Sequence, residues 1–249
     1  LKPAEKSMNE HKKTLGILGG LGPMSSVYFY RLITEHTKAS CDQEHIDVVL
    51  LSGASIPDRT EFITGKSKVS PMPAMKAGIH KLCTAGAEII AIPCNTAHYF
   101  YSEISKDSPV PVLNIIEETV KQAKKVGAKK LGIMATDGTV KSGSYQKVCE
   151  EHGMDYVIPS EKSQAALMDI IYGSVKCAKA PDTDKFRAVA HELCDAGCDM
   201  LVLGCTELSL LDAPKICPEC RFMDSLLVLA KVSIEKCGAI PFGFEEIYN

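Results

Sequence analysis

The chain has 249 residues, of which 45% are apolar and 24% are charged, and its formal net charge is -3 at pH 7. This composition excludes an intrinsically disordered chain and indicates a globular enzyme or binding protein of one or two domains. A near-neutral charge balance without Trp lacks the electrostatic footprint of nucleic-acid binding, so we expect no nucleic-acid partner. No apolar run reaches the roughly 18 residues of a membrane-spanning helix, so we expect no membrane association.

The eleven cysteines are interpreted as free thiols rather than as a disulfide scaffold. Such scaffolds belong to short secreted chains, whereas Cys83, Cys94, Cys194 and Cys205 lie in or beside apolar stretches, where a free Cys acts as a small hydrophobe. We therefore expect a reducing, cytoplasmic compartment. Residues 1–13 are polar and lack the apolar core of a secretory signal, which predicts a flexible N-terminal extension.

Short apolar runs alternate with longer amphipathic patterns along the chain. In chain order the patterns predict a strand at 15–18, a helix at 27–36, a strand at 48–51, a helix at 75–85, a strand at 89–92, a helix at 120–126, a strand at 131–134, helices at 144–152 and 185–196, and a strand at 200–203. Short buried strands that alternate with helices are typical of parallel sheets. The sequence therefore predicts an α/β fold in which parallel sheets are flanked by helices.

The alternation is also an internal repeat. Six residues recur 111 positions later, where His80, Leu82, Cys83, Ala85, Gly86 and Cys94 are matched by His191, Leu193, Cys194, Ala196, Gly197 and Cys205. A second match pairs Leu15-Gly16-Ile17 with Leu131-Gly132-Ile133. The repeat predicts two pseudo-symmetric α/β domains around a cleft. We expect the first domain to span 14–115, with 226–249 returning to it, and the second to span 116–225.

Cys94 and Cys205 each follow a predicted strand and precede polar residues suited to helix capping. Ligands of parallel sheets collect at the carboxyl ends of strands, and a helix N-terminus lowers a thiol pKa from its free value of about 8.5. Either cysteine alone is more simply a buried core residue. As a pair in related domains, they could serve opposite faces of a planar carbanion, which is what racemisation requires.

Five motifs carry a family resemblance over nearly the whole chain, from residue 14 to about 244. They are Gly19-Gly20-Leu21-Gly22-Pro23, Ile56-Pro57-Asp58-Arg59-Thr60, Cys94-Asn95-Thr96-Ala97-His98, Ala135-Thr136-Asp137-Gly138-Thr139 and Gly204-Cys205-Thr206-Glu207-Leu208. Together they resemble the cofactor-independent aspartate/glutamate racemase family, most closely its aspartate racemase branch.

The resemblance implies a pyridoxal-phosphate-independent amino-acid racemase in which Cys94 and Cys205 are the two catalytic bases. The positions that it assigns to substrate binding are Leu21, Arg59, Thr60, Asn95, Thr96, Ala97, Thr139, Lys176 and Thr206. Ser26, His98 and Glu207 are expected to support the site from behind these residues. The resemblance further implies a small-molecule substrate, no cofactor, no metal and a homodimer.

Two departures from the glutamate racemase branch favour aspartate as substrate. That branch typically carries an Asp-Ser pair in its first loop and a His after the second Cys-Thr, where this chain has Gly19-Gly20 and Glu207. Glutamate or a broader set of dicarboxylic amino acids is the alternative. A related cysteine-dependent isomerase or decarboxylase, such as maleate isomerase, is another. A periplasmic-type binding module also has two α/β lobes, but it predicts a secretion signal and needs no thiols.

Several residues also have a simpler interpretation. Arg59 and Lys176 could be solvated surface charges. The first glycine-rich loop resembles a dinucleotide site, but Ser25 stands in place of the third glycine. Cys217-Pro218-Glu219-Cys220 has the spacing of a metal or redox half-site, yet no second pair in the sequence supplies four ligands, so we expect no zinc. Cys194 and Cys198 are interpreted as a coincidence on one helix face.

Overall fold

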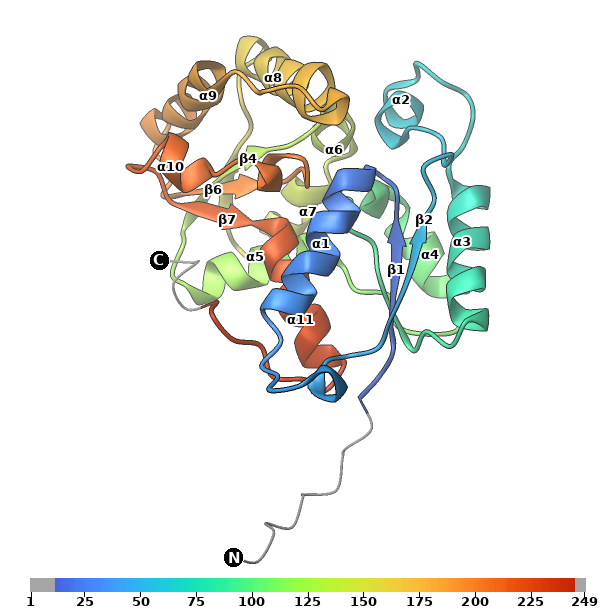
Figure 1. Cartoon of the computed structure of the whole chain (residues 1–249). Helices are drawn as coiled ribbons and strands as arrows, with labels where there is room; N and C mark the ends of the chain where they lie inside the picture. The colour runs from blue at the N-terminus through green and yellow to red at the C-terminus, as the bar shows by residue number, and fades with distance from the viewer. Residues whose placement is uncertain (1–11, 245–249) are drawn as a thin grey trace, which may run out of the picture.

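The computed structural model describes residues 12–244, which form two parallel β-sheets flanked by helices (Figure 1). The first sheet has the order β2-β1-β3, with β1 at Leu15–Gly19, β2 at Val48–Ser52 and β3 at Ile89–Ala91. The second has the order β5-β4-β6-β7, with β4 at Lys130–Met134, β5 at Asp155–Val157, β6 at Met200–Leu203 and β7 at Phe222–Asp224. All named strand pairs in this part of the chain are parallel, so the predicted α/β fold is confirmed.

The helices cover the faces of both sheets. They are α1 (Pro23–Glu35), α2 (Arg59–Thr64), α3 (Met72–Thr84), α4 (Tyr101–Asp107), α5 (Ile115–Lys125), α6 (Asp137–Ser142), α7 (Ser144–Glu151), α8 (Glu161–Met168), α9 (Thr183–Asp195), α10 (Ala213–Ile216) and α11 (Ser225–Lys236). Short 3₁₀ segments lie at Asp42–Glu44, Thr96–Phe100, Val175–Cys177 and Leu208–Leu210, and a π-helical turn at Asp169–Ser174. Several helices begin before their predicted start. These helices start at residues that favour a helix N-terminus, such as Pro23 in α1 and the N-cap Asp182 before α9. The predictions were based on apolar residues, which come later in each helix.

The repeated Leu-Gly-Ile motif has a packing reason. A Cβ added at Gly16 of β1 would lie 2.6 Å from Ile90 Cδ1, and one added at Gly132 of β4 would lie 2.6 Å from Leu201 Cδ2. In both sheets the glycine leaves room for a neighbouring strand's side chain. The sequence repeat thus corresponds to the same close contact at the same place in each sheet.

One apolar core runs between the two sheets. Ile17 of β1, Ile133 of β4 and Leu229 of α11 belong to the same cluster of buried side chains. In Figure 1, α1 and α11 lie side by side in front of this core, and the two helices are in contact. After α11 the chain returns to the end of α1, where the Phe242 N–H donates to the carbonyl of His36 over 3.0 Å.

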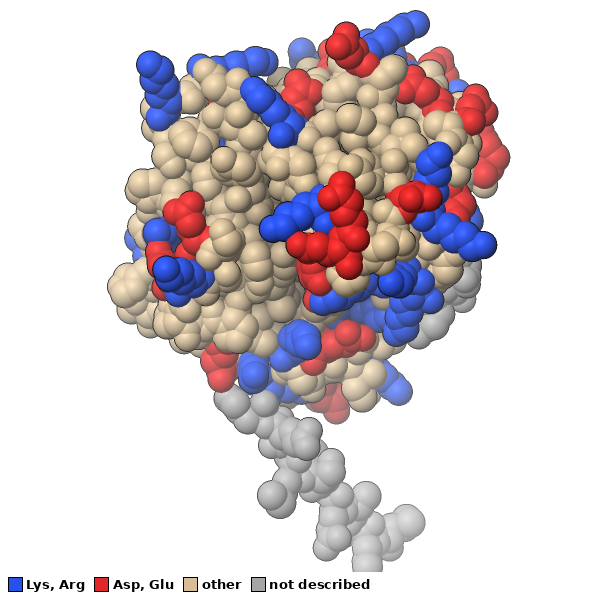
Figure 2. Space-filling model, turned by 180° about the vertical axis from the view of Figure 1, so that it is seen from behind, with Lys and Arg blue, Asp and Glu red and all other residues tan. Residues whose placement is uncertain are grey.

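The expected N-terminal extension at 1–13 lies outside the described residues except for its last two, and residues 245–249 also lie outside them. Lys13 donates its backbone N–H to the carbonyl of Cys237 over 2.9 Å. Among the residues from 12 to 244, no helix is both long and apolar enough to cross a membrane. Figure 2 shows basic and acidic side chains interspersed over the face opposite to that of Figure 1.

Candidate active site

Cys94 and Cys205 follow β3 and β6 and line the same small cavity, which has about 10 Å³ of free space. Each cysteine is only 5% exposed. The cavity is lined by Leu21, Arg59, Thr60, Cys94, Asn95, Thr96, Thr136, Tyr172, Lys176, Cys205, Thr206 and Glu207. The two cysteines that the sequence repeat pairs therefore share one enclosed site at the carboxyl ends of strands from different sheets.

The backbone of Cys94 is held by the buried ring of His98. Nδ1 of His98 lies 2.8 Å from the Cys94 carbonyl oxygen, and its Nε2 accepts the backbone N–H of Ile115 at 3.3 Å. Burial lowers the pKa of His98, which keeps the ring neutral. A neutral ring with a proton on Nδ1 satisfies both hydrogen bonds. His98 does not line the cavity; it fixes the peptide that carries the first thiol.

Arg59 is a buried cation beside Cys94. Burial lowers the pKa of Arg59, but the nearby charges of Cys94 and Asp58 outweigh this, so the net direction is upward. Its guanidinium donates to the carbonyls of Leu21, Ile56 and Pro57 at 3.0, 3.2 and 3.0 Å, while Nε has no partner. Arg59 is therefore a positioned, permanently charged group of the site rather than a surface charge.

Cys205 is held by Glu207. The thiol donates to Glu207 Oε2 over 3.0 Å, and Lys176 Nζ lies 2.6 Å from Oε1 of the same carboxylate. Burial and the negative charge of Glu207 raise the pKa of Cys205 well above its usual value, and Lys176 opposes this in part. Cys205 is therefore a protonated thiol in this state of the site. Glu207 lies in the cavity itself, nearer to the chemistry than the sequence predicts.

Three buried threonines form one hydrogen-bonded group at the side of the cavity. The hydroxyl of Thr96 lies 2.9 Å from those of Thr136 and Thr139, which are 3.1 Å apart. Gly138 lets α6 approach the first half closely, because a Cβ there would lie 2.9 Å from Thr60 Cα and 3.0 Å from Thr96 Cγ2. Thr96, Thr60 and Thr136 line the cavity, whereas Thr139 supports them from behind.

Asn95 links the two halves of the molecule. Its Oδ1 accepts the hydroxyl of Tyr145 in α7 at 2.7 Å, and its Nδ2 donates to Ser225 Oγ in α11 at 2.9 Å. Ser225 in turn donates to the carbonyl of Leu203 at the end of β6 over 2.7 Å. All three side chains are buried. The residue after the first cysteine is thus tied to the strand that precedes the second.

The glycine-rich loop after β1 supplies Leu21 to the cavity and is held by Ser26. The hydroxyl of Ser26 accepts the N–H of Gly20 at 2.8 Å and donates to the carbonyl of Gly22 at 3.0 Å. Ser26 therefore shapes the loop without reaching the cavity. Ala97, which the resemblance assigns to substrate binding, is buried and does not line the cavity either.

Sequence reasoning missed Tyr172 and Thr136 as lining residues. Tyr172 lies in the π-helical turn Asp169–Ser174, and its hydroxyl donates to Asp58 Oδ2 at 3.1 Å. Lys176 Nζ lies 5.2 Å from the centre of the Tyr172 ring, within reach of a cation–π interaction. The wider turn brings both side chains into one site. Thr136 could have been predicted as a site residue, because it lies in one of the five motifs of the resemblance.

The site therefore combines two thiols, two cations and one carboxylate around a small enclosed volume. Thiols can give and take protons, and the cations Arg59 and Lys176 suit a substrate with carboxylate groups. The hydroxyls of Thr60, Thr96 and Thr206 add uncharged hydrogen-bonding groups. This arrangement is suited to proton transfer at a carbon atom next to a carboxylate.

The chain was compared with known proteins. The family described as Asp/Glu/Hydantoin racemase matches residues 18–232. The solved structure of the Picrophilus torridus aspartate racemase is similar with a TM-score of 0.80 and 31% identity, over 95% of this chain and 99% of that one. The broad specificity amino-acid racemase RacX of Bacillus subtilis (strain 168) is 30% identical over 225 residues, 88% of this chain and 96% of that protein.

In sequence, glutamate racemases match a shorter part of the chain. That of Aquifex pyrophilus is 37% identical over 130 residues, which are 51% of this chain and 48% of that protein. The family match and the two full-length similarities, by contrast, span most of the chain. On this evidence, and as its motifs predict, the chain belongs to the Asp/Glu/Hydantoin racemase family.

Proposed function

We propose that this member of the racemase family interconverts L- and D-aspartate without pyridoxal phosphate, using Cys94 and Cys205 as its two bases. The observation that carries the proposal is that both thiols line one cavity together with Arg59 and Lys176. A two-base racemase needs one proton acceptor and one proton donor, on opposite sides of the substrate Cα. For the reverse reaction the two roles exchange.

The surroundings of the thiols support different starting roles. Arg59 lies beside Cys94 as a fixed positive charge, while burial and the charge of Glu207 raise the pKa of Cys205 and keep it protonated, so we assign Cys94 as the starting base and Cys205 as the starting acid. One enantiomer would then lose its α-proton to the Cys94 thiolate and receive a proton from the Cys205 thiol. The product leaves Cys94 protonated and Cys205 ionised, which is the form that accepts the other enantiomer.

The negative charge of the carbanion must be stabilised by groups that line the cavity. The hydroxyls of Thr96 and Thr206 and the polar groups of the loops after β3 and β6 surround the cavity. A carboxylate bound there accepts the charge that spreads from Cα, and fixed dipoles in an enclosed site stabilise it more strongly than water does. These groups are the proposed binding site of the substrate α-carboxylate.

The two cations favour a substrate with a second carboxylate. Arg59 presents a planar guanidinium to the cavity, and Lys176 is held there by Glu207. Glutamate is the second candidate, because glutamate racemases are among the similar proteins, and a broader specificity is the third. We also propose that the protein forms a homodimer, which light scattering would test.

The test is incubation of the purified, reduced enzyme with L-aspartate in D₂O. Chiral chromatography follows D-aspartate, and NMR follows deuterium at Cα. Wild type should form D-aspartate that carries deuterium, while Cys94→Ala and Cys205→Ala should both abolish racemisation. The exposed Cys41→Ala is a matched control and should racemise like wild type.

Three other results would change the assignment. Racemisation that survives the loss of either thiol contradicts the two-base mechanism. Reaction with L-glutamate but not L-aspartate moves the substrate to the second candidate. No exchange with either amino acid, together with turnover of maleate, assigns the site to a related isomerase.

A further inference from the structure

A second cluster of metal-binding side chains lies on α9, apart from the cavity of the candidate active site. His191 and Cys194 lie three residues apart on α9 and therefore on one face of that helix. The loop after α10 brings Cys217 and Cys220 against this face. None of these four residues lines the cavity around Cys94 and Cys205.

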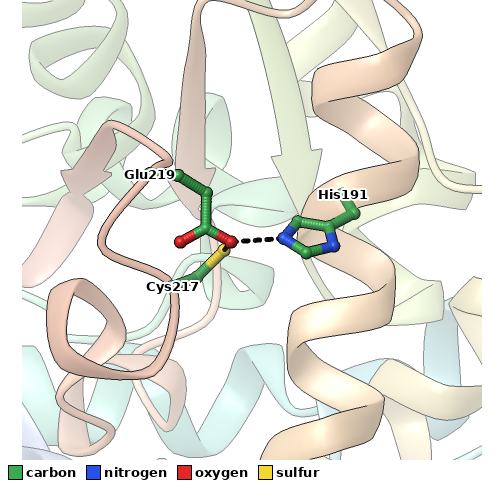
Figure 3. Close-up of side chains that lie close together, drawn as sticks. All are labelled: His191, Cys217 and Glu219. Carbon is green, nitrogen blue, oxygen red and sulfur yellow. Dashed lines mark hydrogen bonds and ion pairs between the residues drawn. The ribbon is translucent and has the colours of Figure 1, made fainter.

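The donor atoms of the cluster are close together. Cys220 Sγ lies 3.1 Å from Cys194 Sγ and 3.2 Å from Cys217 Sγ. The ring nitrogen of His191, Cys217 Sγ and a Glu219 carboxylate oxygen all lie within 4.8 Å of one another (Figure 3). Figure 3 shows the imidazole of His191 pointing from α9 toward the loop, where Nε2 contacts Glu219.

The cysteines of the cluster are free thiols. Their Sγ–Sγ separations are longer than the disulfide bond of about 2.05 Å. Two thiolates on one tetrahedral zinc, each about 2.3 Å from the ion, lie about 3.8 Å apart. Cys220 Sγ lies within 3.2 Å of both other sulfurs, so side-chain rotations about this central cysteine would bring three sulfurs around one ion.

We propose that His191, Cys194, Cys217 and Cys220 bind a zinc ion. Three cysteines and one histidine form a set typical of structural zinc sites, with the Cys-x-x-Cys loop supplying two neighbouring ligands. On binding, the three thiols lose their protons to solvent as three Zn–S bonds form, and neutral Nε2 of His191 gives the fourth bond. The ion ties the loop between α10 and β7 to α9.

Glu219 is the competing donor in this cluster. Its carboxylate contacts His191 Nε2 and accepts the Cys217 thiol at 3.2 Å. Zinc prefers nitrogen and thiolate sulfur where they are available, and the Glu219 side chain is 51% exposed. The carboxylate is therefore replaced at Nε2 by the ion and turns toward solvent.

The sequence analysis expected no zinc, because no second pair of ligands accompanies Cys217 and Cys220 in the sequence. His191 and Cys194 lie on a different element from the loop, so their approach follows from the fold rather than from the spacing. The sequence repeat also provides an internal control. Helix α3 carries the equivalent residues His80 and Cys83, yet among residues 12–244 only the cluster on α9 groups His, Cys and acidic donors at ligand distance.

The test is titration of the reduced wild-type protein with Co²⁺, followed by displacement with Zn²⁺. Tetrahedral cobalt bound to thiolates gives a visible d–d band and a near-ultraviolet sulfur-to-cobalt band. We expect one Co²⁺ per chain with both bands, and loss of both on adding one equivalent of Zn²⁺. Zn²⁺ should also raise the thermal midpoint of unfolding, because an ion bound only by the folded state stabilises it.

Variants assign the ion to the cluster. His191→Ala changes an exposed residue, so folding should be retained, and it should weaken Co²⁺ binding at least tenfold and remove the rise in thermal midpoint. Cys217→Ser should also weaken Co²⁺ binding and remove the rise in thermal midpoint, and it should weaken the near-ultraviolet band. His80→Ala, Cys83→Ser and Glu219→Gln should each leave one tightly bound ion.

The proposal is overturned if the reduced wild-type protein gives no tetrahedral cobalt spectrum. It is also overturned if the spectrum survives His191→Ala and Cys217→Ser unchanged. A spectrum that disappears in Cys205→Ala would place the ion on the catalytic thiols and would equally contradict the proposal.

Discussion

The thiol of Cys205 and the carboxylate of Glu207 lie 3.0 Å apart and share a hydrogen bond that the thiol donates. The other oxygen of this carboxylate is paired with Lys176, so an anion separates the proposed acid from one of the two cations. A negative charge so close to a buried thiol opposes its ionisation. Glu207 is therefore a positioning residue that sets when Cys205 holds its proton.

Glu207→Gln should lower the pKa of Cys205. The thiol must be protonated to act as acid, so activity is present below its pKa and is lost as pH rises through it. The alkaline limb of the kcat/KM profile should move to lower pH by about one unit or more, because a hydrogen bond to a charged group is worth about 1.5–3 kcal/mol. An unchanged alkaline limb, measured for the enantiomer that Cys205 protonates, would remove Glu207 from this role.

Arg59→Lys keeps the charge but loses the planar fork that reaches three backbone carbonyls. We expect kcat/KM for aspartate to fall by about 10- to 100-fold through a higher KM, since one or two charge-assisted hydrogen bonds are lost. Steady-state kinetics on both variants measures this, with the exposed Arg31→Lys as control. Equal KM values in the two variants would show that Arg59 does not bind the substrate.

Tyr145→Phe removes the hydroxyl that Asn95 Oδ1 accepts and leaves a buried acceptor without a partner. The free energy of unfolding should fall by about 1–3 kcal/mol, which is the cost of such a group. Urea denaturation measures it. Tyr156→Phe, which removes an exposed hydroxyl bonded to Glu150, should change it by less than about 0.5 kcal/mol. Equal losses in the two variants would contradict the importance of the buried link.

The buried His98 makes the stability of the folded protein depend on pH. Its folded-state pKa lies below the unfolded value of about 6.5, so the unfolded chain takes up the proton first. The stabilisation is complete above that pH and is lost as pH falls toward the folded-state pKa. Urea midpoints of wild type should fall between pH 7 and pH 5. His98→Asn should be less stable at pH 7 and show a flatter profile; a parallel profile would assign the slope to other groups.

The sequence predicted those features that depend on pattern. Cys94 and Cys205 were found because the repeat and the apolar strands place both at strand ends. Tyr172 was missed because no local periodicity marks the π-helical turn that directs it into the site. Strands β5 and β7 were not predicted because each has three residues that include an Asp, whereas the equally short β3 lies in an uninterrupted apolar run. Ala97 and Thr139 lie in the motifs but behind the cavity, since a motif does not tell which side chains reach the ligand.

The domain limits stay a prediction, and the reason lies in the core. Ile17, Ile133 and Leu229 come from three parts of the sequence and pack in one cluster, so within residues 12–244 this cluster crosses the expected boundary rather than marking it. Burial in that cluster is set by contacts between distant segments. Such contacts are not visible in the order of the residues.

The buried link between Asn95, Tyr145 and Ser225 ties the two halves of the molecule together beside the thiols. An opening of the two halves at that link would leave buried polar groups unpaired, at about 1–3 kcal/mol for each. A second cavity shares Lys176 and Glu207 with the site and extends to Met24, which is 59% exposed. The paired side chains of Lys176 and Glu207 line both cavities, so this ion pair lies between the thiols and the more exposed surface around Met24.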